Sequence, residues 1–321
     1  MFKRSCFLIL LLAVCSLSFA KGKQAYHQKI EITESVRFLE ISIVSGDLKL
    51  SGTANHEIKM DGFLGEDVEK LEIKTTPTTV YVEVKLPKSG WNIDGDVELA
   101  IELPAYLNLK ITTVSASIAL KDVASNEIYL KSVSGDLSGS FIAKEITLQS
   151  VSGDIETDHR LSAITSTFRG QKELDATKSG GMAVHTEVLD IETVSGEITF
   201  SLDPVREMNI KSVSGDITGS IEGAERVKAN TTSGDIELHF KGLSSPRIDL
   251  NSVSGDVYLE LIGKLDIRLQ AKTFSGSVSN QITHDEALES EHGPGSKLRL
   301  ELGSAKGDVN INTFSGDIQL H

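Results

Sequence analysis

Cysteine is almost absent from the sequence: its 321 residues include two, Cys6 and Cys15, and both lie among the first 20. Those 20 residues begin with two basic side chains, continue with a short apolar run and end in small residues. This order predicts a secretory signal peptide, residues 1–20, that is cleaved after Ala20. The remaining chain then contains no cysteine, which excludes disulfides, thiol catalysis and cysteine-bound metals.

The apolar run near the start is too short to span a membrane as a helix. We therefore expect an exported protein of the periplasm or the cell surface, with no transmembrane segment once the signal is removed. A lipoprotein acylated on Cys15 is the alternative. A lipoprotein signal needs a small residue directly before the cysteine, and Val14 fits this position poorly. The sequence favours cleavage after Ala20 over a lipid anchor.

Basic residues are also scarce. Lys and Arg number 32 against 46 Asp and Glu, for a formal net charge of −14, and cleavage of the signal would remove Lys3 and Arg4 as well. This charge argues against nucleic acid and anionic lipid surfaces as partners. Aromatic residues make up 5% of the chain and include one tryptophan, so stacking platforms for sugar rings are few. A carbohydrate-active β-helix enzyme is therefore an alternative rather than the favoured interpretation.

What the sequence has in abundance is a short repeat. Ser-Gly-Asp or a near copy recurs around nine glycines that we interpret as structural corners: Gly46, Gly135, Gly153, Gly196, Gly215, Gly234, Gly255, Gly276 and Gly316. From Gly135 onwards most successive corners are 18 to 21 residues apart. Two longer steps, of 43 and 40 residues, predict a degraded repeat inside each, with Gly170 and Gly295 as candidate corners. Gly95 is a further candidate.

Aligned on the corner glycine, the residues fall into columns. Leu130, Lys131 and Leu137 represent an apolar, a polar and a second apolar column on either side of Gly135. This alternation has the period of a β-strand with one buried face. Two adjacent columns, one of hydroxyls such as Ser132 and one apolar such as Val133, break the alternation, so the chain must bend there. Each repeat therefore predicts a strand, a corner and a second strand.

One strand–corner–strand unit cannot bury its apolar face alone, whereas stacked units share a core. The sequence predicts an all-β, single-stranded β-helix, or β-solenoid, with about 20 residues per turn. Right-handed winding is expected from the chirality of parallel crossovers. We expect a less regular solenoid part over residues 21–125 and regular repeats over residues 126–321. A β-sandwich is the alternative, but it does not require identical corners at a fixed period.

These columns resemble a bacterial "putative adhesin" family of unknown function, made of exported β-strand repeat proteins with Val-Ser-Gly-Asp corners. The resemblance rests on residues 130–137 and their copies at 148–155, 210–217 and 250–257, and it covers roughly residues 30–321. It implies the repeat fold and an envelope location. It implies no catalytic residues, because the family has none assigned.

The acid that follows each corner glycine is the sharpest candidate for chemistry. Stacking would bring Asp136, Asp154, Asp216, Asp235 and Asp256 to about one coil spacing, about 5 Å, from their neighbours, where each pair repels by about 0.8 kcal/mol in a water-like dielectric. Backbone N–H groups at the corner can offset this repulsion, and so can bound Ca²⁺. The sequence favours solvated corner caps over a calcium site, since calcium-binding repeats carry a denser glycine and aspartate pattern.

A second metal hypothesis concerns one acidic loop. Its side chains include two histidines and four acids: His284, Asp285, Glu286, Glu289, Glu291 and His292. Such residues can bind a divalent metal, but a polar acidic loop is more often simply solvated. We expect no cofactor.

The favoured interpretation is a non-catalytic exported envelope protein, an adhesin-like scaffold or interaction surface. Its expected partner is an envelope polymer or another protein, because a stack displays the same outward residue once per turn. Besides the enzyme, an envelope-stress regulatory or sensing protein is an alternative.

Overall fold

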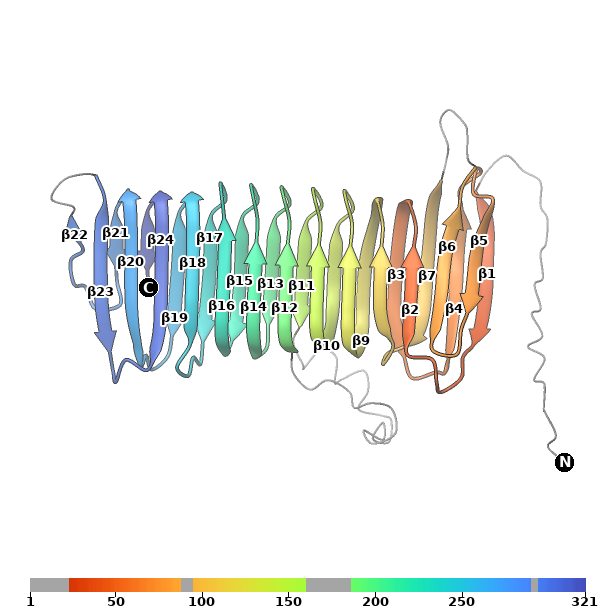
Figure 1. Cartoon of the computed structure of the whole chain (residues 1–321), viewed down its shortest axis with the longest axis horizontal. Coiled ribbons are helices and arrows are strands. Elements are labelled where there is room, and N and C mark those ends of the chain that lie inside the picture. Colours follow the sequence, from red (N-terminus) through yellow and green to blue (C-terminus); the bar gives the residue numbers. More distant parts are fainter. Residues whose placement is uncertain (1–22, 88–94, 160–185, 290–293) are drawn as a thin grey trace.

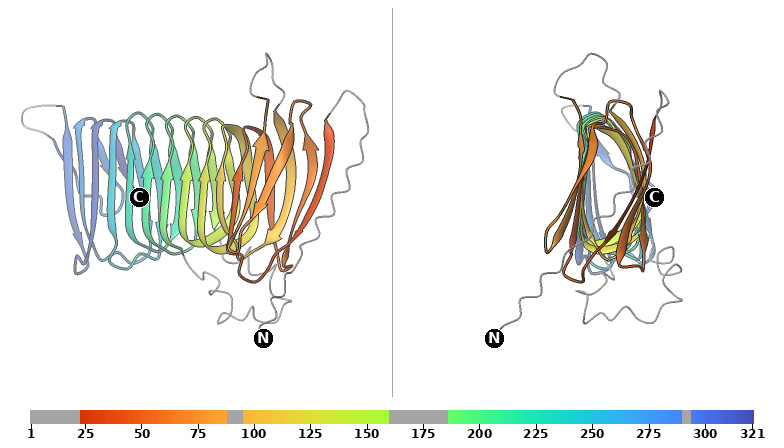
Figure 2. Two further views of the ribbon diagram at one scale, coloured as in Figure 1. Left: turned by 45° about the vertical axis from the view of Figure 1, so that its right-hand side comes forward. Right: turned by 90° about the vertical axis from the view of Figure 1, so that its right-hand side faces the viewer.

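The computed structural model describes residues 23–87, 95–159, 186–289 and 294–321. Within these ranges the secondary structure comprises 25 β-strands and no helix. The strands lie side by side in one long body (Figure 1), and the end-on view of Figure 2 shows two facing layers that meet at narrow edges. The predicted all-β solenoid is confirmed. The predicted signal peptide and both cysteines lie outside the described residues.

Two central coils show how the repeat folds. Strand β14 (Val205–Lys211) leads to a corner, and β15 (Ile217–Glu222) leaves it. The next coil repeats this with β16 (Ala224–Thr231) and β17 (Ile236–Lys241). Both strands pair in parallel with those of the preceding coil, β14 with β16 and β15 with β17. Residues of one sequence column therefore stack directly on one another.

The strands form two faces joined at the corners. The entry face contains the strands that lead to a corner, which besides β14 and β16 are β2 (Phe38–Ser42), β6 (Thr79–Lys85), β8 (Asn108–Thr112), β12 (Thr186–Glu192), β18 (Arg247–Ser254), β20 (Ile267–Ser275) and β24 (Gly307–Ser315). The exit face contains the strands that leave a corner, which besides β15 and β17 are β3 (Ser45–Thr53), β7 (Asp96–Pro104), β11 (Ile155–His159), β13 (Ile198–Leu202), β19 (Val257–Ile262), β21 (Val278–Asn280) and β25 (Ile318–Leu320). The long strands β9 (Ser115–Lys131) and β10 (Leu137–Gln149) pass from the exit face to the entry face.

The core fills the narrow space between the two faces. Inward columns are almost completely buried, as at Ile210, Ile217 and Ile236. Each such side chain contributes roughly 1.5–3 kcal/mol of transfer free energy when removed from water. Since every coil repeats the same inward columns, the core is a continuous strip along the whole body.

The last coil is inserted between two earlier ones. Strand β24 pairs in parallel with β18 on one side and with β20 on the other, and Ile311 lies opposite both Leu250 and Ala271. Strand β25 lies in the same way between β19 and β21. At this end of the solenoid, the order of the coils in the stack therefore differs from their order in the sequence.

The first coil is inserted in a similar way. Strand β2 pairs in parallel with both β6 and β8, and β3 pairs in parallel with both β7 and β9. The coil of residues 38–53 therefore lies between two coils that follow it in the chain. Only the middle of the solenoid, from β9 to β19, stacks in sequence order.

Antiparallel strands cap both ends of the stack. At one end β4 (Glu57–Leu64) pairs with β7, β1 (Gln24–Glu31) with β4, and β5 (Lys70–Thr75) with β6. At the other end β23 (Ser296–Leu302) pairs with β20, and β22 (Leu288–Glu289) with β23. These strands reverse the direction of pairing at the two ends of the solenoid.

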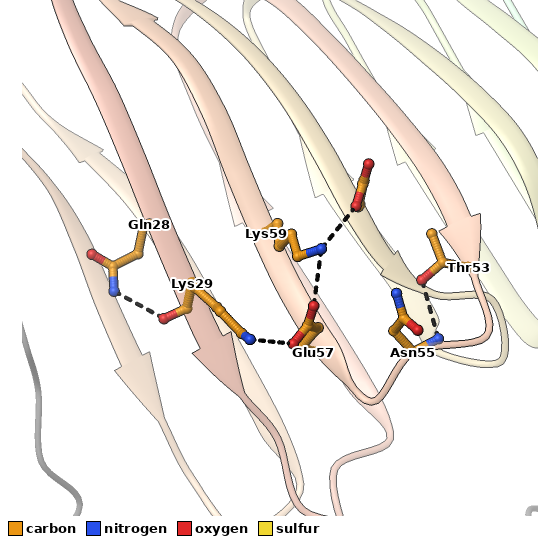
Figure 3. A network of polar contacts seen from close by, with 7 residues as sticks. Gln28, Lys29, Thr53, Asn55, Glu57 and Lys59 are labelled. Atoms are coloured by element: carbon orange, nitrogen blue, oxygen red, sulfur yellow. Dashed lines mark hydrogen bonds and ion pairs between the residues drawn. The ribbon is translucent and has the colours of Figure 1, made fainter.

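Figure 3 shows a charged network on the first cap, where Glu57 accepts from Lys29 at 2.6 Å and from Lys59 at 3.0 Å. The hydrogen bonds from Lys29 and Lys59 lower the pKa of the Glu57 carboxyl. Such exposed pairs add little stability, but a charged edge discourages pairing with another chain.

The structure corrects the prediction of hidden repeats. Ile155 of β11 pairs directly with Ile198 of β13, so no coil separates the corners at Gly153 and Gly196. The extra residues of that step, 160–185, include Gly170 and lie outside the described residues. The second long step contains the cap strands, and Gly295 precedes the antiparallel strand β23 rather than forming a corner.

Gly95 is also not equivalent to the other corner glycines. Val97 stands opposite Gly46, two positions after Gly95, because β7 pairs with β3 in that register. The prediction of a corner glycine at this position is wrong.

Candidate functional site

The corners line up along one edge of the solenoid, here called the corner edge. In the coil of Gly135, the side chains of Val133, Ser134 and Asp136 are exposed, while Ser132 points inward and is buried. Because the inward hydroxyl precedes it directly, Val133 must point outward. The corner edge therefore displays three parallel rows: apolar, hydroxyl and acidic.

The apolar row runs along ten coils with one interruption, at Thr232, and is here called the apolar ridge. In stacking order it consists of Val44, Val114, Val133, Val151, Val194, Val213, Thr232, Val253, Phe314 and Phe274. Its hydrophobic members are between 39% and 57% exposed. At about 4.8 Å per coil, ten positions extend for about 43 Å. Such a long exposed apolar row is typical of an interaction surface.

Backbone hydrogen bonds fix the spacing of the ridge. The N–H of Val114 donates to the carbonyl of Val44 at 3.2 Å, and the N–H of Val133 donates to that of Val114 at 3.1 Å. At the far end the rings of Phe274 and Phe314 stack with centroids 4.8 Å apart and planes 9° apart. The ridge is thus held by the ladder of the solenoid itself.

The buried hydroxyl column stabilises the corners from inside. The Oγ of Ser132 accepts the N–H of Gly135 at 2.8 Å, and Ser212 does the same for Gly215 at 2.8 Å. Further coils repeat the bond with Ser150, Thr193 and Thr231. A backbone N–H buried at the bend would otherwise lack a partner. This explains why a small hydroxyl residue stands at this position in the sequence.

Close stacking explains the corner glycine. A Cβ added to Gly215 would lie 1.8 Å from the carbonyl oxygen of Gly196 in the neighbouring coil. Gly46 also has a positive φ of 115°, which favours glycine for a second reason. Close approach of neighbouring coils therefore requires glycine at corners such as Gly215, where no positive φ does.

The acids that follow the corner glycines form a row beside the ridge, here called the acid row, in which Ser277 replaces the acid after Gly276. In each bond the Oδ1 of one aspartate accepts the backbone N–H of the acid in the next coil: Asp136 from Asp154 at 3.0 Å, Asp154 from Glu197 at 2.8 Å, Asp216 from Asp235 at 2.8 Å, Asp235 from Asp256 at 2.7 Å and Asp256 from Asp317 at 2.7 Å. These N–H groups offset the repulsion between stacked carboxylates.

The structure therefore places the five aspartates proposed from the sequence in one row, and it supplies a backbone partner for their charge. The partner comes from the neighbouring coil rather than from the residue's own corner. Where a glutamate stands in the row, the carboxylate of Glu197 accepts instead from the hydroxyl of Thr199 at 3.3 Å.

Charge is distributed unequally between the two faces. Between residues 136 and 262 the corners and the strands of the exit face carry many acids, namely Asp136, Asp154, Glu156, Asp158, Glu197, Asp216, Glu222, Asp235, Glu237, Asp256 and Glu260, and two lysines, Lys144 and Lys241. On the entry face acids pair with bases of the next coil, as in Glu192 with Lys211 at 2.5 Å and Glu207 with Arg226 at 2.8 Å. In this part of the solenoid the excess of negative charge thus lies on the corners and the exit face.

One histidine lies among these acids. His239 contacts Glu260 through Nδ1 at 2.7 Å and Glu237 through Nε2 at 3.1 Å. Burial alone would lower the pKa of His239, but the hydrogen bonds to Glu260 and Glu237 outweigh it and raise the pKa. His239 therefore adds positive charge to the exit face as the pH falls.

The acidic loop does not form a compact group in the described part of the chain. His284, Asp285, Glu286 and Glu289 are exposed, while Glu291 and His292 lie outside the described residues. The described ranges contain no group of three or more His, Cys, Asp or Glu side chains that could hold a metal ion. They also contain no helix long and apolar enough to cross a membrane.

A comparison with solved structures finds several matches that are distant in sequence. A protein of Parabacteroides distasonis named "putative lipid binding protein" is 14% identical, with 92% of this chain and 96% of that chain covered and a TM-score of 0.49. A "putative adhesin" of Bacteroides fragilis is 12% identical, with 76% and 100% covered and a TM-score of 0.41. A "putative cell adhesion protein" of Clostridium sporogenes is 16% identical, with 92% and 99% covered and a TM-score of 0.22.

A comparison with curated proteins finds no match. Residues 63–321 match the model of one protein family, which extends over most of the chain. This match confirms the resemblance indicated by the Val-Ser-Gly-Asp corners. The chain belongs to the Toastrack DUF4097 family.

Proposed function

We propose that the protein is a non-catalytic, adhesin-like protein of the cell envelope, exported through its N-terminal signal, that binds its partner along the corner edge. The observation that carries this proposal is the apolar ridge, an exposed apolar row that runs across most of the solenoid. Exposed hydrophobic area of this extent is costly for a soluble protein unless it is used for binding.

The repetition of the edge supports binding over catalysis. Glycoside hydrolysis needs two carboxylates whose environments give them different roles. In the acid row several aspartates accept the same kind of hydrogen bond, from the backbone N–H of the acid in the next coil. Asp216 accepts it from Asp235, and Asp235 accepts it from Asp256. Equivalent carboxylates do not divide into an acid and a base.

Repetition also favours multivalent contact. Most coils offer one ridge side chain and one acid at the same spacing, with Ser117 and Ser277 in place of the acid in two coils, so a long partner contacts several coils at once. Weak contacts at single coils then add to a stable complex, because each later contact is intramolecular. This suits a scaffold that holds an extended or repeating partner.

The test compares the purified protein with a ridge variant that carries Val133→Thr, Val151→Thr, Val194→Thr and Val213→Thr. Thr232 occupies the ridge naturally, so the fold accepts threonine at these positions. A control variant carries Ile262→Thr and Leu288→Thr, which replace exposed apolar residues away from the ridge. All three proteins are sedimented with isolated cell envelopes.

We expect the original protein and the control to sediment with envelopes and the ridge variant to remain in solution. Equal sedimentation of all three proteins would overturn the proposal. Release of reducing ends from envelope polysaccharide by the purified protein would also overturn it, in favour of an enzyme.

A further inference from the structure

We propose that the partner of the corner edge is a basic amphipathic α-helix, which lies along the solenoid axis with its apolar stripe on the apolar ridge and its basic side chains over the acid row. This inference rests on the proposed function, since it names the partner class for the same surface. It is carried by the spacing of the ridge and by the distribution of charge beside it.

The spacing of the ridge matches a helix better than a strand. Ridge side chains recur at about 4.8 Å, the distance between neighbouring strands. Along an extended chain, residues on one side recur at about 6.6 Å, whereas an amphipathic helix presents its apolar stripe once per turn of about 5.4 Å. The difference of about 0.6 Å per contact lets a helix meet four or five successive coils before it loses register.

The ridge side chains also suit this packing. Val133, Val151, Val194 and Val213 are branched and form an unbroken series in the stack. The ridge side chains, one per coil, fit between the side chains of a helical stripe, as the ridges of one helix fit into the grooves of another. The ridge from Val44 to Phe274 is about 43 Å long, so a helix of roughly 29 residues at 1.5 Å per residue would run its length and would be in register with it over four or five coils at a time.

Charge selects the kind of helix. In most corners an acid follows the ridge residue by three positions, with Ser117 and Ser277 as the exceptions, and further exposed acids such as Glu156 and Glu237 lie on the exit face beyond it. The Oδ1 of Asp235 accepts the N–H of the next coil, and the side chain is exposed to solvent. A helix with Lys or Arg along one border of its apolar stripe complements this arrangement.

The same charge argues against two other occupants. A second copy of this chain placed ridge to ridge in antiparallel orientation would bring two acid rows together, and like charges in an interface are unfavourable. An anionic lipid surface would meet the acid row with its phosphates, which is also repulsive. Both remain outcomes that the experiment distinguishes.

The experiment uses the purified protein and three synthetic 22-residue peptides. The first has leucines at helical spacing bordered by lysines, the second carries glutamate in place of each lysine, and the third has the composition of the first in an order without an apolar stripe. Binding is followed by fluorescence anisotropy of the labelled peptide and helix formation by circular dichroism. We expect the lysine peptide alone to bind and to gain helicity on binding.

Two variants of the protein test whether the lysine peptide contacts the apolar ridge and the acid row. The ridge variant with four Val→Thr substitutions is expected to bind the lysine peptide at least about tenfold more weakly, since apolar burial is lost. An acid-row variant with Asp136→Asn, Asp154→Asn, Asp235→Asn and Asp256→Asn keeps the Oδ1 acceptors and loses the charge. It is expected to bind about tenfold more weakly at low salt, with the difference vanishing at about 0.5 M salt.

A matched control changes the opposite face. Glu127→Gln, Glu145→Gln, Glu225→Gln and Asp249→Asn remove the same number of charges from the entry face and are expected to leave binding within about twofold of the original. Equal weakening by this control and by the acid-row variant would overturn the inference, because binding would then follow net charge alone.

Other results would also overturn it. These are equal binding of the glutamate or the scrambled peptide, binding of phosphatidylglycerol vesicles that the ridge variant loses, or a dimer of the free protein that the ridge variant abolishes. If the ridge variant loses envelope binding while no peptide binds, the proposed function stands and the helix is wrong. If envelope binding is unaffected by the ridge variant, the proposed function itself fails.

Discussion

The Oδ1 atom of Asp235 lies 2.7 Å from the backbone nitrogen of Asp256, one coil further along the stack. We predict that Asp235→Ala destabilises the protein by about 1 kcal/mol relative to Asp235→Asn, because only alanine leaves the N–H of Asp256 without its acceptor. Both variants lose the same charge, so the difference isolates the hydrogen bond. Urea unfolding measures it, and identical midpoints for the two variants would contradict the role assigned to the acid row.

Calcium provides a second test of the same row. Because backbone N–H groups already compensate the carboxylates, we predict that 5 mM Ca²⁺, a concentration chosen to exceed typical weak-site affinities, leaves the thermal midpoint as it is in EDTA. The measurement is a thermal melt in each buffer, with Mg²⁺ as the control cation. A rise of several degrees with Ca²⁺ alone would establish the calcium site that the sequence raised as a hypothesis.

The close stacking of corners makes a steric prediction. Gly215→Ala would place a methyl group 1.8 Å from the carbonyl oxygen of Gly196, so the two coils must separate, at a cost of about 3 kcal/mol. Gly242 is the matched control, because a Cβ there meets nothing within 4 Å and only the positive φ of 70° opposes it. Gly242→Ala should cost about 1 kcal/mol. Chemical unfolding that ranks the two variants in the reverse order would refute the steric explanation.

His159 makes the stability of the solenoid dependent on pH. Its ring lies 4.6 Å from that of Phe141, and within the described part of the chain neither of its nitrogens has a hydrogen-bond partner. Burial lowers the pKa of His159 from 6.5 to about 4, although Asp158 acts in the opposite direction. As the pH falls, His159 therefore becomes protonated near pH 6.5 in the unfolded chain but only near pH 4 in the folded protein.

Stability should consequently fall as the pH is lowered through this window, by about 3 kcal/mol in total from this residue. His159→Leu removes the effect, so the two proteins should diverge in unfolding free energy below pH 6.5 and remain parallel above it. Parallel curves from pH 7 to pH 4 would show that His159 does not titrate differently on folding.

The inserted last coil leads to a prediction about truncation. A chain that ends at Ala305 lacks β24 and β25, which lie between β18 and β20 and between β19 and β21. We predict that it loses the folded structure of strands β20 to β23 and aggregates, because the edges of β18 and β19 become exposed. Limited proteolysis and gel filtration report both changes.

A deletion at the other end serves as the control. Removing the chain through Glu31 takes away β1, which pairs with β4 and lies outermost on its face. The inner coils remain paired, so this protein should stay monomeric with a smaller loss of stability. If the two truncations behave alike, the inserted coil is no more important than a terminal strand.

The sequence was sufficient to predict most of the repeat. The alternation around Leu130 and Leu137 and the inward hydroxyl at Ser132 follow from side-chain periodicity, and the structure has them in place. Exposure of Val133 was implied by the same columns, since an outward residue must follow an inward one. In the sequence, the apolar character of Val133 indicates only a bend in the chain. The ridge follows from the stacking of the coils, which aligns Val133 with the equivalent residues of its neighbours.

The stacking order could not be predicted in the same way. All coils share the same columns, so the pattern around Ile311 fits equally well beside Leu250 or at the end of the stack. Which neighbour a coil takes depends on the cap strands and connections, where the period is lost. The prediction of hidden repeats around Gly170 and Gly295 is wrong for that reason, because spacing alone does not distinguish a coil from a longer connection between coils.

The inserted coils also determine how proteins of this kind can change length during evolution. Tandem duplication places a new repeat next to its parent in the gene, and from β9 to β19 neighbours in the gene are neighbours in the stack. A duplicated coil is accepted there by the same inward columns. A copy placed directly after β25 would follow a coil that is already enclosed on both sides. Growth of the solenoid is therefore confined to its interior, and its two ends are expected to be inherited unchanged.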